Sequence, residues 1–124
     1  MVQTLIERSM IDRSITGEET NFDVGPSESG TLYSSFGALA IITASLPPWS
    51  RNLHYGFMRN AAFDFRVGPD GADIIRLATS LIGGAGKYLQ LDAAGVVVNL
   101  IAGPEPGIWE IETVNDITLL SVEP

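Results

Sequence analysis

The chain has 124 residues and no cysteine, which is the size of a single domain and excludes disulfides and thiolate metal sites. Fifteen acidic residues against seven basic ones give a formal charge of −8. This charge argues against free duplex DNA or an anionic membrane as the main partner, because both bind basic surfaces.

Residues 1–20 differ from the rest of the chain. Their apolar residues recur at roughly helical spacing, and they are Val2, Leu5, Ile6, Met10, Ile11 and Ile15. The pattern predicts a short amphipathic helix or an extended arm that becomes ordered on a neighbouring subunit. The segment lacks the basic start and long apolar run of a signal peptide. No stretch of the chain approaches the ~20 apolar residues of a membrane span. We therefore expect a protein that is soluble in the cytoplasm or belongs to a particle, such as a virion, that is assembled there.

Residues 21–124 carry the signals of one β domain, with short apolar or alternating runs separated by glycine and proline turns. Strands are predicted over residues 39–46, 63–67, 74–78, 88–91, 96–101, 109–113 and 117–122. Turns or loops are predicted over residues 68–71, 92–95 and 103–107, with 92–95 forming a hairpin. The glycine-rich segment 81–86 is interpreted as a flexible loop, and the aromatic segment 53–58 as either a strand or an exposed loop.

Short strands at roughly ten-residue spacing are typical of an all-β fold. We expect an antiparallel β-sandwich of the Ig-like or jelly-roll type, preceded by the arm or helix. A β-trefoil is the alternative, because a step of aromatic, acidic and apolar residues begins at each of Phe22, Phe63 and Trp109. Any β protein repeats strands and turns, so this echo does not by itself establish a threefold repeat.

No pattern in the sequence matches a catalytic or cofactor site. Residues 83–87 are glycine-rich, but their spacing fits neither a phosphate loop nor a dinucleotide fingerprint. His54 is the only histidine, which argues against a zinc site in a chain without cysteine. Glu110 and Glu112 alternate along one predicted strand and are interpreted as a solvated face rather than as paired glycosidase carboxylates. We expect no enzymatic activity, no cofactor and no metal.

Two segments are the candidate contact surfaces. The first is the apolar side of the N-terminal segment, formed by Leu5, Ile6, Met10 and Ile11. The second is an aromatic and basic cluster of residue types that dominate protein interfaces, and it contains Trp49, Arg51, His54, Tyr55, Phe57 and Arg59. This cluster is equally compatible with a piece of core under a long loop.

The second half of the chain resembles a known family. The motifs are AAFDFRV at residues 61–67, IIRLATS at 74–80, YLQLDAAGVVV at 88–98 and PGIWEIE at 106–112. They resemble the Ig-like β-sandwich modules of tailed-phage virion proteins, above all the N-terminal domain of baseplate upper proteins. Residues 22–60 depart from that pattern. GKYL at residues 86–89, followed by the strand with Trp109, is also similar to fascin-like β-trefoils.

The resemblance implies a non-enzymatic structural protein of a phage virion, either a capsid decoration (cement) protein or a tail or baseplate component. Its partners would be other virion proteins and further copies of itself, with no role for nucleic acid or membrane. The alternative is a β-trefoil carbohydrate-binding module in which a glycan stacks on Trp49 or Tyr55. The sequence leaves open the position in the particle and the oligomer symmetry.

Overall fold

The computed structural model describes residues 14–77, 80–83 and 87–123, and this part of the chain is almost entirely β-structure. The exceptions are two short 3₁₀ turns, η1 (Pro26–Glu28) and η2 (Ile117–Leu119). The expectation of an all-β fold is therefore confirmed. The described residues contain no helix that is long and apolar enough to cross a membrane.

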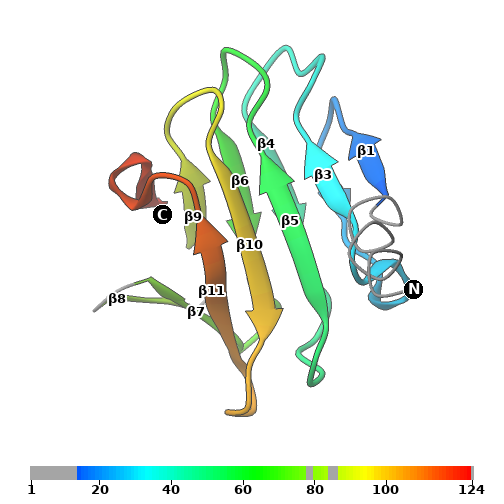
Figure 1. Ribbon diagram of the computed structural model, residues 1–124, viewed down its shortest axis with the longest axis vertical. Coiled ribbons are helices and arrows are strands. Elements are labelled where there is room, and N and C mark those ends of the chain that lie inside the picture. Colours follow the sequence, from blue (N-terminus) through cyan, green and yellow to red (C-terminus); the bar gives the residue numbers. More distant parts are fainter. Residues whose placement is uncertain (1–13, 78–79, 84–86, 124) are drawn as a thin grey trace, which may run out of the picture.

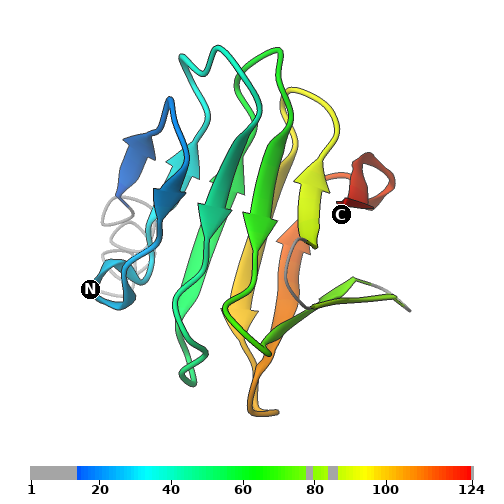
Figure 2. The same ribbon diagram turned by 180° about the vertical axis from the view of Figure 1, so that it is seen from behind.

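The strands form two sheets (Figures 1 and 2). The larger sheet has the order β1 (Ile15–Gly17), β3 (Leu32–Ser34), β5 (His54–Met58), β10 (Val97–Ala102), β11 (Ile108–Val114), β7 (Ile74–Leu77) and β8 (Ser80–Gly83). The smaller sheet has the order β12 (Leu120–Glu123), β9 (Tyr88–Leu91), β6 (Phe65–Gly68), β4 (Ile42–Ser45) and β2 (Phe22–Asp23).

The first six strands alternate between the two sheets. Strands β1, β3 and β5 lie side by side in the larger sheet, and β2, β4 and β6 lie side by side in the smaller one. Between two neighbouring strands of one sheet, the chain passes through one strand of the other sheet, and these neighbours run parallel. Strand β7 is also parallel to β11. Both sheets are mixed, so the expectation of purely antiparallel pairing was wrong.

The two sheets lie one over the other and share a core of aromatic and aliphatic side chains (Figure 1). Phe57 of the larger sheet meets Phe65 of the smaller one edge to face, with ring centroids 5.9 Å apart. The rings of Phe22 and Tyr33 make a second contact between the sheets, at 5.0 Å. Such pairs add a specific geometry to the general gain from burying apolar area.

Several predicted elements differ in detail. Residues 92–95 do not close a hairpin, because β9 lies in the smaller sheet and β10 in the larger one. Part of the expected loop 81–86 belongs to β8, which pairs with β7 and buries Ile82. The expected strand 39–46 begins only at Ile42. The last predicted strand, 117–122, begins with a 3₁₀ turn, and its strand is β12.

The N-terminal segment enters the sheet before residue 20. Residues 15–17 form β1, which pairs with β3 at the edge of the larger sheet. The segment expected to be an arm or helix thus includes a strand. Residues 1–13, with the predicted contacts Leu5, Ile6, Met10 and Ile11, lie outside the described residues.

Two core tyrosines use their hydroxyl groups to hold the turn that contains η1. The Tyr33 hydroxyl donates to Oε1 of Glu28 at 2.9 Å, and the Tyr55 hydroxyl donates to the carbonyl of Gly25 at 2.9 Å. Burial raises the pKa of Tyr33, and the hydrogen bond to Glu28 raises it further. Burial also raises the pKa of Tyr55, and the negative charge of Glu28 adds to this effect.

These shifts predict a loss of stability at alkaline pH. In the unfolded chain both phenols ionise near their ordinary pKa of about 10, whereas in the folded chain they hold their protons to higher pH. The stabilisation is therefore complete below about pH 10 and declines as the pH rises beyond it. Urea unfolding at a series of pH values from about 8 to 12 should show this decline. A Tyr33→Phe/Tyr55→Phe variant should show a flatter profile, and an unchanged slope in that variant would contradict this assignment.

Candidate functional site

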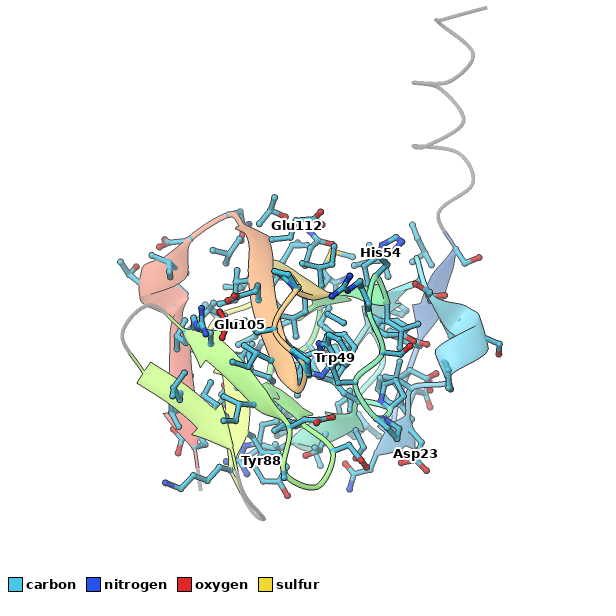
Figure 3. All side chains as sticks on the ribbon, turned by 90° about the horizontal axis from the view of Figure 1, so that it is seen from below. Asp23, Trp49, His54, Tyr88, Glu105 and Glu112 are labelled. Carbon is cyan, nitrogen blue, oxygen red and sulfur yellow. The ribbon has the colours of Figure 1, made fainter. Side chains whose placement is uncertain are left out.

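The aromatic and basic cluster predicted between residues 49 and 59 does not form one patch, because its members are spread along the length of the molecule. Trp49 lies at the end seen in Figure 3, half-buried against the core. Its indole N–H donates to the carbonyl of Ile108 at 3.1 Å, and its backbone N–H donates to Oδ2 of Asp73 at 2.8 Å. Trp49 thus joins its own loop to the loop of Asp73 and to the start of the strand at Ile108, at this end of the core.

Tyr55 and Phe57 point into the core from β5 and are almost inaccessible to solvent. Their predicted role as contacts for an outside partner was wrong, and the core interpretation that the sequence left open holds for both. Tyr55 is also too buried to stack on a glycan. Strand alternation explains the placement, since His54, Gly56 and Met58 occupy the opposite face of the same strand.

Two members of the cluster remain on the surface. Arg51 is exposed and reaches the carbonyl of Pro104 at 3.5 Å. His54 is exposed at the edge of the outer face of the larger sheet, where its backbone N–H bonds to the hydroxyl of Ser29. Of the six residues of the predicted cluster, these two are the exposed ones.

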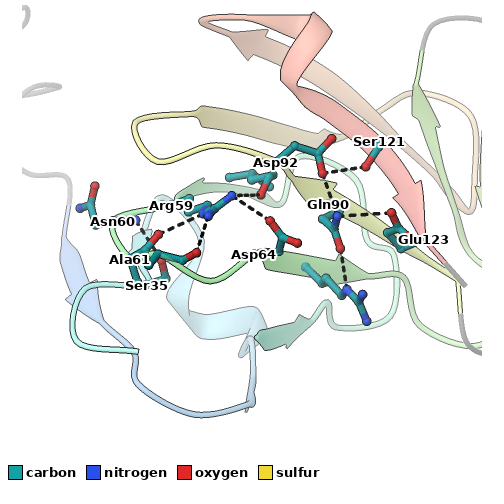
Figure 4. Close-up of polar contacts among 12 residues, drawn as sticks. Ser35, Arg59, Asn60, Ala61, Asp64, Gln90, Asp92, Ser121 and Glu123 are labelled. Atoms are coloured by element: carbon teal, nitrogen blue, oxygen red, sulfur yellow. Dashed lines mark hydrogen bonds and ion pairs between the residues drawn. The ribbon is translucent and has the colours of Figure 1, made fainter. Parts of the chain in front are cut away.

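Arg59 is buried, with only 7% of its surface exposed, and its guanidinium is surrounded by acceptors (Figure 4). It donates to the carbonyl of Ala61 at 3.0 Å, the carbonyl of Ala62 at 2.8 Å and the carbonyl of Leu91 at 3.3 Å. An ion pair of 2.8 Å joins it to Asp64. Its predicted role as a surface contact was wrong, because its side chain holds the loop between β5 and β6 from within.

The neighbouring loop between β3 and β4 is fixed in a similar way. The Asn60 backbone N–H donates to the hydroxyl of Ser35 at 2.9 Å, and its side-chain amide donates to the hydroxyl of Ser34 at 2.8 Å. Gly37 in this loop has a φ of +87°, and a Cβ atom there would lie 2.8 Å from the Glu19 carboxylate. Glycine is therefore required for the observed path.

These two fixed loops present large apolar side chains to solvent. Leu39 is 86% exposed and Phe36 71% exposed, and Ile41 and Phe63 are also exposed. The loops lie side by side at the end of the molecule opposite Trp49 (Figures 1 and 2). We call this surface, formed by Phe36, Leu39, Ile41 and Phe63, the apolar loop end. A hollow of about 250 Å³ beside it is lined by Glu19, Thr20, Gly37, Leu39 and Ala40.

The residue pattern is misleading at this surface. Phe63 alternates with Phe65 and Val67, and this alternation predicts that the three share one face of a strand, yet Phe63 precedes the strand and is exposed. Leu39 begins the apolar run 39–46, which predicts a strand, yet it lies before β4. The glycine at position 37 and the serines before it were the available indication of a loop.

The predicted carboxylate pair does not form a two-carboxylate site. Glu110 makes an ion pair of 3.1 Å with Arg76. Glu112 lies at a register shift between β10 and β11 and is exposed. Among the described residues, no group of three or more histidine, cysteine, aspartate or glutamate side chains could hold a metal ion.

No protein-family model matches the chain, and no curated protein matches it at a significant level.

Replacing Arg59 tests its role as an internal support. The Arg59→Met variant leaves Asp64 and three carbonyl groups without their donor, so we expect a loss of about 3 kcal/mol or more in the free energy of unfolding. Arg51→Met, at an exposed position, should change that free energy by no more than about 0.5 kcal/mol. Chemical denaturation of both variants measures the difference. Equal effects at the two positions would contradict the support role.

Proposed function

We propose that the protein is a non-enzymatic structural component of a tailed-phage virion, either a capsid decoration protein or a part of the tail or baseplate. It acts in the assembled particle through contacts with other virion proteins and with further copies of itself. The similarity of residues 61–124 to phage virion modules supports this class. The two facing sheets support a β-sandwich, and the parallel pairings among β1 to β6 distinguish it from an ordinary Ig-like sandwich.

The apolar loop end is the observation that carries the proposal. Exposed aromatic and aliphatic side chains that gather on one surface mark sites of protein association. Here they stand on loops that are already held by Arg59, Asn60 and the serines before Phe36, so binding costs little ordering of the backbone.

We assign the apolar N-terminal segment of a neighbouring copy as the occupant. Residues 1–13 contain five of the six regularly spaced apolar residues of the chain start. Strand β1, which follows that segment in the chain, lies at the edge of the larger sheet. The hollow beside Leu39 offers a place for an apolar side chain of such a segment.

A Phe36→Ser/Leu39→Ser variant tests this surface. Because both side chains are exposed, we expect the thermal midpoint to change little while self-association and binding to purified virions weaken by roughly tenfold or more. Light scattering after gel filtration and co-sedimentation with virions measure the two effects. Leu81→Ser, at an exposed apolar position on β8, is the matched control and should retain both.

Deletion of residues 1–13 gives the second arm of the test. If the segment occupies the loop end, the deletion and the double substitution remove the same contact, and their combination should be no worse than either alone. Additive losses would show that the segment binds elsewhere. A strict monomer that never binds virions would contradict the proposed function itself.

A further inference from the structure

The outer face of the smaller sheet carries a second ordered set of side chains, which begins at Thr43, two residues after Ile41 of the apolar loop end. Strand register places Thr43, Arg66, Gln90 and Ser121 in one row across four strands. The next row contains Asp23, Ser45 and Gly68, and beyond Gly68 come Tyr88 and Glu123. Figure 3 shows Tyr88 and Asp23 on the same side of the molecule.

Tyr88 owes its position to the absence of a side chain at residue 68. A Cβ atom on Gly68 would lie 3.0 Å from both Cδ1 and Cε1 of the tyrosine ring. The ring therefore lies over the glycine and takes the space that a neighbouring side chain would fill. The result is a half-buried aromatic ring in the middle of an otherwise polar face.

In the neighbouring row, Arg66 lies near the Tyr88 ring, and Gln90 holds the Arg66 side chain in place. The Arg66 guanidinium carbon is 6.0 Å from the centroid of the Tyr88 ring, and its Nε donates to Oε1 of Gln90 at 2.8 Å. The Gln90 amide in turn donates to Asp92 at 2.7 Å and to Glu123 at 3.3 Å (Figure 4). This chain of bonds orders the side chains around the ring before any ligand arrives.

Beside the ring is a hollow of about 270 Å³, which Tyr88 lines together with Asn21, Phe22, Asp23, Thr43 and Ser45. Within the described part of the chain, the side chains of Asp23, Thr43 and Ser45 make no hydrogen bond or ion pair. The side-chain oxygen Oδ1 of Asn21 accepts a hydrogen bond from the backbone N–H of Thr43 at 2.8 Å, and this bond orients the Asn21 amide group. A carboxylate, two hydroxyl groups and an amide thus surround one small space.

We propose that this face binds a neutral saccharide, with Tyr88 against the C–H face of one sugar ring and Asp23, Thr43, Ser45 and Asn21 bonding its hydroxyl groups. An aromatic ring meets the apolar face of a sugar, and the polar rim supplies both donors and acceptors for the hydroxyls. The combination of an aromatic surface with a few fixed polar groups is characteristic of small-molecule sites.

The charges at the face select among ligand classes. Asp23 in the hollow, Glu123 at the end of its row and the overall charge of −8 all disfavour phosphorylated or sulfated ligands. The guanidinium of Arg66 on this face already bonds to Gln90. The site is separate from Trp49 and Tyr55, which the sequence suggested for stacking and which serve the core.

Affinity gel electrophoresis of the full chain tests the proposal with soluble glucan, mannan, xylan and galactan, and with heparin as the anionic comparison. We expect retardation by at least one of the neutral polymers and none by heparin. Tyr88→Ala should lower the affinity for the retarding polymer by at least about tenfold, because it removes the stacking surface. Gly68→Val should have a similar effect by displacing the ring, and Asp23→Asn tests the hydroxyl contacts independently.

Phe36→Ala is the matched control, because it removes an exposed aromatic ring at the other surface and should leave retardation unchanged. The proposal is overturned if no neutral polymer retards the protein, if heparin retards it more strongly, or if Tyr88→Ala binds as well as the natural sequence. Gly68 is buried in β6, so Tyr88→Ala decides the matter if the valine variant does not fold. Virion binding by Tyr88→Ala should be normal, which separates this test from that of the apolar loop end.

Discussion

Arg59 keeps a full positive charge in a place that is almost closed to water. Such a charge is tolerated only when acceptors replace its hydration shell. Asp64 and the carbonyls of the 61–62 loop supply acceptors from the segment that follows, while Leu91 supplies one from the smaller sheet. The backbone N–H of Arg59 also donates to Val96, just before β10 of the larger sheet. One residue thus joins both sheets at the end where the exposed apolar side chains stand, so the rigidity of that surface depends on a group that is itself hidden.

The first six strands alternate between the two sheets and therefore form no hairpins with one another. Side-chain contacts inside the domain lie where hairpin turns would otherwise order the strands. In a hairpin the turn sets the register of two neighbouring strands. Here consecutive strands lie in different sheets, so register must come from contacts between the sheets, such as Phe57 with Phe65 and Phe22 with Tyr33. Core packing and buried hydrogen bonds therefore replace turns in setting the strand register. This explains why an arginine and two tyrosines with hydrogen-bonded hydroxyls lie inside this small domain.

The same winding sets the limit of what the sequence could predict. Alternation and turn residues located most strands of the second half, because β9, β10 and β11 each have a clear pattern of their own. They could not show that the turn at residues 92–95 crosses between sheets, since a tight turn has the same composition in either role. In the predicted contact cluster, residue type and spacing indicated Arg59 and Tyr55 as surface contacts for a partner. Both are buried, and they support the domain from within instead. A buried arginine is recognised by acceptors that come from distant segments, such as Leu91, and no local pattern contains that information.

The two outward surfaces follow from these constraints in different ways. At the loop end, apolar side chains are exposed because the backbone beneath them is held by polar bonds and cannot fold them into the core. On the smaller sheet, alternation sends Phe65 and Val67 inward and leaves Arg66 and Gly68 outside, and the missing side chain at Gly68 admits the ring of Tyr88. The first surface offers apolar area without polar partners, which suits a protein neighbour. On the second surface, the side chains of Asp23, Thr43 and Ser45 lie beside one half-buried ring and make no hydrogen bond within the described residues, which suits the small polar ligand that we propose.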